Sequence, residues 1–297
     1  NNLLYFSRMK VTGFSFIRNA IKYQYPIEEA ICSILPLCDE VVVAVGASED
    51  GTRDLVASIS KKVTIVDTVW DDSLREGGKV LAAETNKAFH TISNDTDWCF
   101  YIQGDEVVHE DGYDEIRTAM AKWKDDKNVD GLLFKYRHFY GSFDYVGTSS
   151  RWYKNEIRII KNNKQIYSYR DAQGFRKGND EKLNVKLLNA YVHHYGWVRE
   201  PEAMEAKSHD FSRLWAGDNW EPKKVYTGKF DYEKSIDALE KYHGTHPQVM
   251  TARIEKANWQ FDYDLSFNQL PLKEKFKNAF EKITGKRPFD YHNYKIV

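Results

Sequence analysis

The stretch Trp98-Cys99-Phe100-Tyr101-Ile102-Gln103-Gly104-Asp105-Glu106-Val107-Val108-His109 joins an apolar run to an acidic pair. The run is typical of a buried strand, and Asp105 and Glu106 follow directly after it. In α/β proteins, side chains at the carboxyl end of such a strand project into the crevice where ligands bind. A carboxylate in that position needs a cation, and Mg²⁺ or Mn²⁺ shared with substrate phosphates is a common one. A solvated turn after a core strand is the competing interpretation.

Strands and helices alternate over the preceding hundred residues. The predicted order is strand 11–17, a helix from Pro26, strand 40–46, a helix from Thr52, strand 63–66, helix 79–90 and the strand at Trp98. The run 41–45 is apolar on both faces, which indicates a central parallel strand. We therefore predict a doubly wound α/β domain with a mostly parallel central sheet flanked by helices, and a ligand above the strand ends.

Four features of this segment occur in a fixed order. They are a first strand that ends in Arg18-Asn19, the helix sequence 26–35, the loop Ser48-Glu49-Asp50-Gly51-Thr52 and a strand that ends in Gly104-Asp105-Glu106. As a set, over at least residues 11–111, they resemble a family 2 glycosyltransferase of the GT-A fold. In that family the first two loops hold the nucleotide of an activated sugar. An Asp-x-Asp motif binds the divalent ion that bridges the diphosphate.

The resemblance implies a nucleotide-diphosphate sugar, linked to UDP or GDP, as the donor and Mn²⁺ or Mg²⁺ as the cofactor. The donor-binding positions that it implies are Phe16, Arg18, Gly46, Ser48, Gln103, Gly104 and Asp105. Lys79, at the start of the third predicted helix, is a further candidate contact of the diphosphate, with a solvated lysine as the competing interpretation. Asp105 matches the second acid of the motif and is the expected metal ligand. Gln103 replaces the first acid, which puts metal dependence in doubt. Gly46-Ala47-Ser48 replaces a loop that usually carries an aspartate, which leaves the nucleotide base open.

A second metal ligand is expected in the stretch Tyr191-Val192-His193-His194-Tyr195-Gly196-Trp197. This stretch resembles the His-Tyr-Gly-Trp segment of a bacterial subgroup of family 2 associated with surface glycans. We expect His194 rather than His193 to reach the metal, because successive residues of a strand face opposite sides. Glu106 is a further candidate ligand. A structural histidine that hydrogen-bonds a loop is the competing interpretation.

An inverting transfer also needs a general base, and a carboxylate across the site from the metal is the expected group. We expect Asp171, which follows a predicted half-buried strand from Ile166 and takes roughly the place of the acceptor-side acid in related enzymes. A turn aspartate paired with Arg170 is the competing interpretation. Asp144 and Glu156 are the reserve candidates.

We divide the chain into a GT-A domain, 8–199, and a helical C-terminal extension, 200–297, packed on it. The nucleotide-sugar half is about 8–111 and the acceptor half about 112–199. In the extension, helices are predicted at 201–215, 232–242 and 272–283. The last helix opposes apolar residues to lysines. We expect its apolar face to dock on the parent domain, with peripheral membrane contact as the alternative.

Composition limits the partners and the compartment. The chain has 43 basic and 44 acidic residues and a net charge of −1, which argues against a nucleic-acid partner. Its three cysteines, Cys32, Cys38 and Cys99, are odd in number and lack zinc-site spacing, which indicates reduced thiols. No apolar run reaches membrane-spanning length. We therefore expect a cytoplasmic protein, with the inner face of the membrane as the alternative place.

The sequence as a whole predicts a glycosyltransferase that moves a sugar from a nucleotide-diphosphate donor to a hydroxyl of a glycan or lipid-linked acceptor. We expect inversion, assistance by a divalent metal, and a place in bacterial polysaccharide or surface-glycan synthesis. The alternative is a catalytically degenerate GT-A domain that binds nucleotide or glycan without turnover. A sugar nucleotidyltransferase fits less well, because residues 13–18 lack the glycine-rich phosphate loop that it requires.

Overall fold

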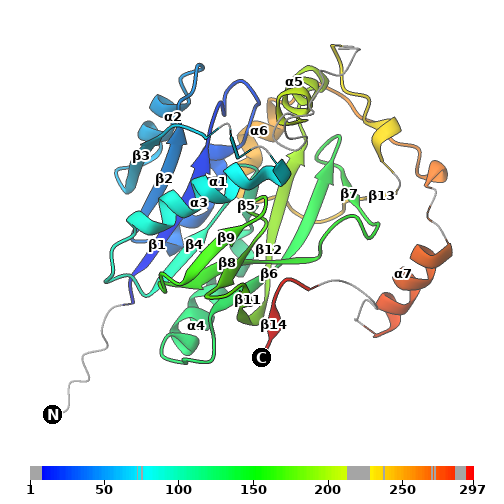
Figure 1. Ribbon diagram of the computed structural model, residues 1–297. Coiled ribbons are helices and arrows are strands. Elements are labelled where there is room, and N and C mark those ends of the chain that lie inside the picture. Colours follow the sequence, from blue (N-terminus) through cyan, green and yellow to red (C-terminus); the bar gives the residue numbers. More distant parts are fainter. Residues whose placement is uncertain are drawn as a thin grey trace.

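A central β-sheet with helices on both faces organises the protein (Figure 1). The computed structural model describes residues 9–71, 73–74, 76–212, 228–236, 238–268, 270, 272–284 and 292–297. The strand order along the main path of the sheet is β13-β7-β6-β8-β4-β1-β2-β3, and β12 joins it through β6.

The first half of the chain alternates strands and helices as predicted. Its elements are β1 (Val11–Ile17), α1 (Ile27–Ile34), β2 (Glu40–Gly46), α2 (Thr52–Ile59), β3 (Val63–Thr68), α3 (Lys79–Thr91) and β4 (Trp98–Tyr101). The four strands are parallel, and β1 lies between β2 and β4. Since the carboxyl ends of parallel strands meet at one edge, residues that follow β1 and β4 come close together.

The second half adds antiparallel pairs and a long strand. Its elements are β5 (Glu106–Val108), α4 (Tyr113–Trp123), β6 (Gly131–Tyr140), β7 (Tyr145–Gly147), β8 (Asn155–Lys161), β9 (Ile166–Tyr169), β10 (Gly174–Lys177), β11 (Glu181–Lys182) and β12 (Asn184–Trp197). β8 is antiparallel to both β4 and β6, while β6 and β12 are parallel. β9, β10 and β11 form a small second sheet.

Two hydrophobic clusters, one on each face of the sheet, hold the layers together. On one face, Ile27 and Ile31 of α1 and Ile116 of α4 pack with buried strand residues. On the other face, Phe89 of α3 and Phe175 of β10 pack against Phe14. Burying an aliphatic or aromatic side chain contributes about 1.5–3 kcal/mol relative to leaving it exposed. The strands are apolar on both faces for this reason, and the predicted α/β fold class is confirmed.

The segment after β12 contributes helices and two short strands. Its elements are α5 (Pro201–Ser212), β13 (Leu239–Lys241), α6 (Thr251–Glu255), α7 (Leu272–Thr284) and β14 (Lys295–Ile296). The helix predicted over 232–242 is wrong, because that stretch forms a 3₁₀ turn at Glu233–Ser235 and then β13, which pairs with β7. Of the helix predicted over 201–215, residues 213–215 lie outside the described part. Within the described residues, no helix is long and apolar enough to cross a membrane.

Candidate active-site cleft

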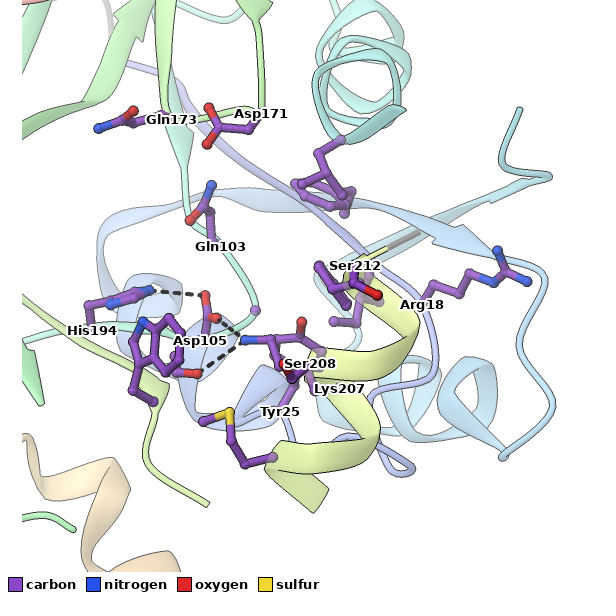
Figure 2. A pocket seen from close by; sticks show the side chains of 18 of the residues that line it. Arg18, Tyr25, Gln103, Asp105, Asp171, Gln173, His194, Lys207, Ser208 and Ser212 are labelled. Carbon is purple, nitrogen blue, oxygen red and sulfur yellow. Dashed lines mark hydrogen bonds and ion pairs between the residues drawn. The ribbon is translucent and has the colours of Figure 1, made fainter. Parts of the chain in front are cut away.

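A cleft of about 650 Å³ opens beyond the carboxyl ends of β1 and β4, and α5 forms one of its walls (Figure 2). Most of the residues singled out from the sequence line it. They are Phe16, Arg18, Gln103, Gly104, Asp105, Asp171 and His194. The sheet topology therefore brings together side chains that are up to 178 positions apart in sequence, from Phe16 to His194.

Strand pairing places Asp105 beside β12. In the β5–β12 ladder, Glu106 lies opposite His194, and Tyr195 N donates a hydrogen bond of 2.8 Å to the Asp105 carbonyl oxygen. The close approach of the His194 ring to Asp105 also needs a glycine at position 196, because a Cβ on Gly196 would lie 2.6 Å from His194 Nε2 and 3.0 Å from Asp105 Oδ2. The sequence expectation that His194 rather than His193 meets Asp105 agrees with this geometry.

The carboxylate of Asp105 lies between two nitrogen atoms. His194 Nε2 is 3.8 Å from Oδ1, and Lys207 Nζ is 3.5 Å from Oδ2. Burial alone would raise the pKa of Asp105, but the neighbouring Lys207 and His194 outweigh it and the pKa is lowered. Asp105 is therefore a buried anion at neutral pH, held ionised by nearby cationic groups.

His138 on β6 fixes which nitrogen of His194 faces Asp105. His138 Nε2 lies 2.8 Å from the Tyr153 carbonyl oxygen, and its Nδ1 lies 3.0 Å from His194 Nδ1. Burial lowers the pKa of both rings, so each is neutral and carries one N–H. The carbonyl can only accept, so His138 donates from Nε2 and accepts at Nδ1. His194 must then donate from Nδ1, which leaves the lone pair of Nε2 directed at the Asp105 carboxylate.

An acceptor nitrogen that faces a carboxylate oxygen makes a place for a cation. Asp105 and His194 supply one oxygen and one nitrogen, and a divalent ion at a nucleotide site takes its other ligands from phosphates and water. Among the described residues, no group of three or more His, Cys, Asp and Glu side chains gathers at metal-binding distance. The two residues thus fit Mg²⁺ or Mn²⁺ as partial ligands that need the diphosphate to complete the shell.

Lys207, on α5, was not singled out from the sequence. Its ammonium group donates to the Gly196 carbonyl oxygen at 3.1 Å as well as contacting Asp105. Burial and the nearby Arg199 lower the pKa of Lys207 to about 7. A signal was available: Met204, Lys207 and Phe211 recur at helical spacing on the face of α5 that lines the cleft. A lysine at helical spacing between Met204 and Phe211 is the pattern that could have identified it.

Asp171 stands in a constrained turn between β9 and β10. Its two neighbours, Arg170 and Ala172, have φ values of 54° and 63°, in the left-handed region that residues with a Cβ rarely adopt. Gln103 Nε2 donates to the Ala172 carbonyl oxygen at 3.1 Å and so fixes the turn. Such residues cost about 1–3 kcal/mol each and cluster at functional sites. Burial raises the pKa of Asp171, which suits a proton acceptor.

The two reserve acids do not line the cleft. Glu156 lies behind Gln173, whose Nε2 donates to Glu156 Oε1 at 3.0 Å, and burial raises the pKa of Glu156 to about 8. Asp144 lies in the turn before β7 and accepts a hydrogen bond from Ser142 Oγ. Of the three candidate bases, Asp171 is the one whose side chain borders the cleft.

Three of the predicted donor residues also lie outside the cleft lining. Gly46 packs beneath Trp70, and a Cβ there would lie 2.4 Å from Trp70 Nε1. Ser48 Oγ donates to the Gly46 carbonyl oxygen and accepts from Asn19 N, so it braces the loop. Lys79 is an exposed first residue of α3.

Glu106, the further candidate ligand, is committed to another partner. Arg158 Nε and Nη2 donate to its two carboxylate oxygens at 2.7 and 2.6 Å, and both side chains are fully buried. Tyr136 donates a third hydrogen bond at 2.9 Å. This buried pair supports the start of β5, directly after Asp105, and Glu106 does not border the cleft.

Two aromatic rings form the wall at the far end of β1. Phe16 and Trp70 lie with ring centroids 6.2 Å apart, and the Arg18 guanidinium lies 5.5 Å from the Trp70 ring. All three line the cleft. An aromatic ring face with an adjacent cation suits a planar, polar ring such as a nucleobase.

The similarity between this chain and known proteins lies in the three-dimensional structure. No family model matches it, and no curated protein is detectably similar to its sequence. Similar solved structures include Staphylococcus aureus TarS, at 16% identity and a TM-score of 0.42, with 72% of this chain and 41% of that chain covered. Another is S. aureus TarS 1–349 in complex with UDP-GlcNAc, at 17% identity and a TM-score of 0.40, with 72% and 68% covered.

A third similar structure is glucosyl-3-phosphoglycerate synthase from Mycobacterium tuberculosis in complex with Mn²⁺, UDP and phosphoglyceric acid. Its identity is 16%, its TM-score 0.30, and 44% of each chain is covered. The present chain thus spans less than half of the TarS chain in the first comparison. With identities and TM-scores this low, the function has to be argued from the cleft itself.

Proposed function

We propose that the protein transfers a sugar from a nucleotide-diphosphate donor to a hydroxyl group of a glycan or lipid-linked acceptor, with inversion at the anomeric carbon. The observation that carries this proposal is the pair of acids in one cleft, Asp105 among cationic groups and Asp171 in a desolvated turn (Figure 2). Two carboxylates whose environments push their pKa values apart can take different roles in one reaction.

The donor fits the side of the cleft that holds Asp105. Its nucleobase would lie against Phe16 and Trp70, and its diphosphate near Lys207. When bound by Asp105 and His194, Mg²⁺ or Mn²⁺ would stabilise the negative charge that develops on the leaving diphosphate. The Lys207 ammonium would contribute to the same stabilisation, and its position in a water-poor site strengthens its effect.

The acceptor fits the side that holds Asp171. Asp171 would take the proton from the acceptor hydroxyl as its oxygen bonds to the anomeric carbon and the bond to the diphosphate breaks. Tyr153 and Trp197 also line the cleft and offer aromatic faces to a sugar ring. The family resemblance supports a place in bacterial polysaccharide or surface-glycan synthesis, in the cytoplasm or at the inner face of the membrane.

The first test is thermal unfolding of the purified protein with a panel of nucleoside diphosphates and nucleotide sugars, each with Mn²⁺ and with chelator. A ligand at 100 times its dissociation constant adds about 2.7 kcal/mol to the free energy of unfolding. We expect a metal-dependent stabilisation by one nucleotide class, followed by release of that nucleoside diphosphate on addition of an acceptor. No stabilisation by any donor would contradict the proposal.

A GT-A domain that binds without turnover is the second candidate. Lys207 favours it, because an ammonium group already pairs with the single acid of the motif. Donor hydrolysis separates the two candidates, because a degenerate domain binds the nucleotide sugar and releases no nucleoside diphosphate from it.

A further inference from the structure

Helix α7 presents its apolar side to solvent. Leu272, Phe276, Phe280 and Ile283 follow one another at intervals of three or four residues and so share one face. Leu272 and Ile283 are each 85% exposed and Phe276 is 66% exposed. The expectation that this face docks on the parent domain is therefore wrong.

The opposite side of α7 attaches the helix to the rest of the protein through polar groups. Glu274 accepts a hydrogen bond of 3.1 Å from Ser150 N, and Glu281 lies 3.8 Å from Lys154 Nζ. A helix that packs on a protein core normally turns its apolar stripe inward. The reversed arrangement in α7 means that the outward face is available to something outside this domain.

Charge on the borders of the apolar face indicates what covers it. At 100° per residue, Lys273 falls on one border of the face and Lys275 on the other, and both are exposed. The two acids lie on the opposite side, in the contacts with Ser150 and Lys154. An apolar face bordered by lysines is the arrangement of helices that lie in an anionic membrane interface. A second copy packed on this face would instead bring lysines together.

The position of α7 relates this surface to the cleft. Two of its contacts are with the loop 148–154, between β7 and β8, and the same loop supplies Arg151 and Tyr153 to the cleft lining. Figure 1 shows α7 at the periphery of the molecule, on the side of β7 and β13. A surface that holds α7 would therefore lie next to one rim of the cleft.

We propose that α7 binds the surface of a membrane rich in anionic phospholipids, with Leu272, Phe276 and Ile283 in the interfacial region and Lys273 and Lys275 on the headgroups. This contact does not depend on the transfer reaction. It would place the loop that carries Arg151 and Tyr153 close to the bilayer, where a lipid-linked acceptor would be found.

The test is co-sedimentation of the whole chain with vesicles, without any nucleotide. One set of vesicles contains phosphatidylcholine alone and the other equal parts of phosphatidylcholine and phosphatidylglycerol. We expect binding to the anionic vesicles that weakens as salt is added, because screening reduces the attraction between lysines and headgroups. The double variant Phe276→Ser/Phe280→Ser should weaken binding about tenfold or more. Lys273→Glu/Lys275→Glu should remove the preference for phosphatidylglycerol.

A matched control reverses two exposed lysines elsewhere, Lys61→Glu/Lys127→Glu, which changes the net charge equally. This control should bind the anionic vesicles nearly as the unchanged protein does, and all variants should keep the same melting temperature. Absence of vesicle binding by the unchanged protein would overturn the proposal. Equal losses in the control and in Lys273→Glu/Lys275→Glu would also overturn it. Self-association abolished by Phe276→Ser/Phe280→Ser, without vesicle binding, would assign the face to a second copy.

Discussion

The two walls of the cleft hold their acids in opposite ways. Asp105 has Lys207 and His194 within 4 Å of its carboxylate, and these neighbours lower its pKa in spite of burial. Asp171 has a raised pKa, because its desolvation outweighs the charges of Arg170 and Arg158. The same residue type is thus stabilised as an anion on one wall and made more basic on the other. This difference separates a cation-binding role from a proton-accepting role.

Backbone geometry shows the same contrast. Asp105 directly precedes β5, so the ladder between β5 and β12 and the hydrogen bond from Tyr195 N to its carbonyl oxygen hold it in place. Asp171 is fixed by a turn in which both neighbours have positive φ values. Regular pairing depends on many hydrogen bonds and tolerates a side-chain change, whereas a turn of this kind depends on a few, such as the one from Gln103. Asparagine has nearly the same shape as aspartate, so we expect Asp→Asn substitutions to test both acids without unfolding either wall.

The largest effect is expected from Asp171→Asn. The amide cannot accept the proton from the acceptor hydroxyl, so turnover should fall about 10³-fold, within the range for loss of a general base. Affinity for the donor should stay the same, because Asp171 lies on the other wall. Calorimetry with the nucleoside diphosphate and a turnover assay would check both. The control is Asp144→Asn, outside the cleft, which should keep turnover. Full activity in Asp171→Asn would assign the base elsewhere.

Asp105→Asn should act on binding rather than on proton transfer. An amide is a weaker ligand than a carboxylate, so the affinity for Mn²⁺ in the presence of nucleoside diphosphate should fall at least about 100-fold, the upper end of what loss of an outer-shell partner costs. Electron paramagnetic resonance of free Mn²⁺ measures this directly. Asp171→Asn serves as the control, with unchanged Mn²⁺ affinity. If Asp105→Asn bound Mn²⁺ and donor normally, the difference between the walls would not be one of cation binding.

A smaller effect is expected from His138→Phe. Phenylalanine cannot accept the hydrogen bond from His194 Nδ1, so His194 is no longer held in the tautomer that presents Nε2 to the ion. Loss of such an outer-shell partner costs about 10-fold to 100-fold in metal affinity, and we expect the lower end. His138→Asn, which keeps an acceptor near the position of Nδ1, should restore part of the affinity. Equal Mn²⁺ affinity in both variants would make His138 a packing residue.

The sequence predicted the structure where a feature follows from the periodicity of a single strand or helix. The alternation of β1 to β4 follows from apolar periodicity and appears in the structure as predicted. Asp105 borders the cleft beyond β4, but β4 ends at Tyr101 and Asp105 lies in the turn before β5 rather than directly at the end of the strand. The choice of His194 over His193 also follows from the alternation of side chains between the two faces of a strand. Periodicity is a local property, so it can be read without knowing which elements meet.

The missed features depend on which elements meet. Lys207 matters because α5 lies over Asp105, and Glu106 is unavailable because β8 carries Arg158 next to it. The stretch 232–242 was expected to be a helix from the spacing of Ile236 and Leu239, but the edge of β7 offered backbone hydrogen bonds that favour a strand at Leu239. Such long-range pairings override local preference. The spacing of residues around Lys207 marks a helix face, but it does not show which element that face meets.

The smallest expected effect concerns the two cations that share Asp105. The Lys207 ammonium repels a divalent ion nearby, so Lys207→Met should raise the affinity for Mn²⁺ alone by a few fold, on the order of 1 kcal/mol at a partly hydrated site. The same change should weaken binding of the nucleoside diphosphate, which loses a positive partner. Opposite signs for the two ligands, measured by calorimetry, would confirm that Lys207 and the ion serve the same anion.

The pH dependence sharpens this last test. The pKa of Lys207 is lowered to about 7, so the ammonium loses its proton, and with it the repulsion, as the pH rises through that value. Between pH 6 and pH 8, Mn²⁺ affinity should therefore rise more steeply in the unchanged protein than in Lys207→Met. Parallel pH profiles would show that Lys207 does not compete for Asp105, and the cationic character of that wall would then come from Arg199.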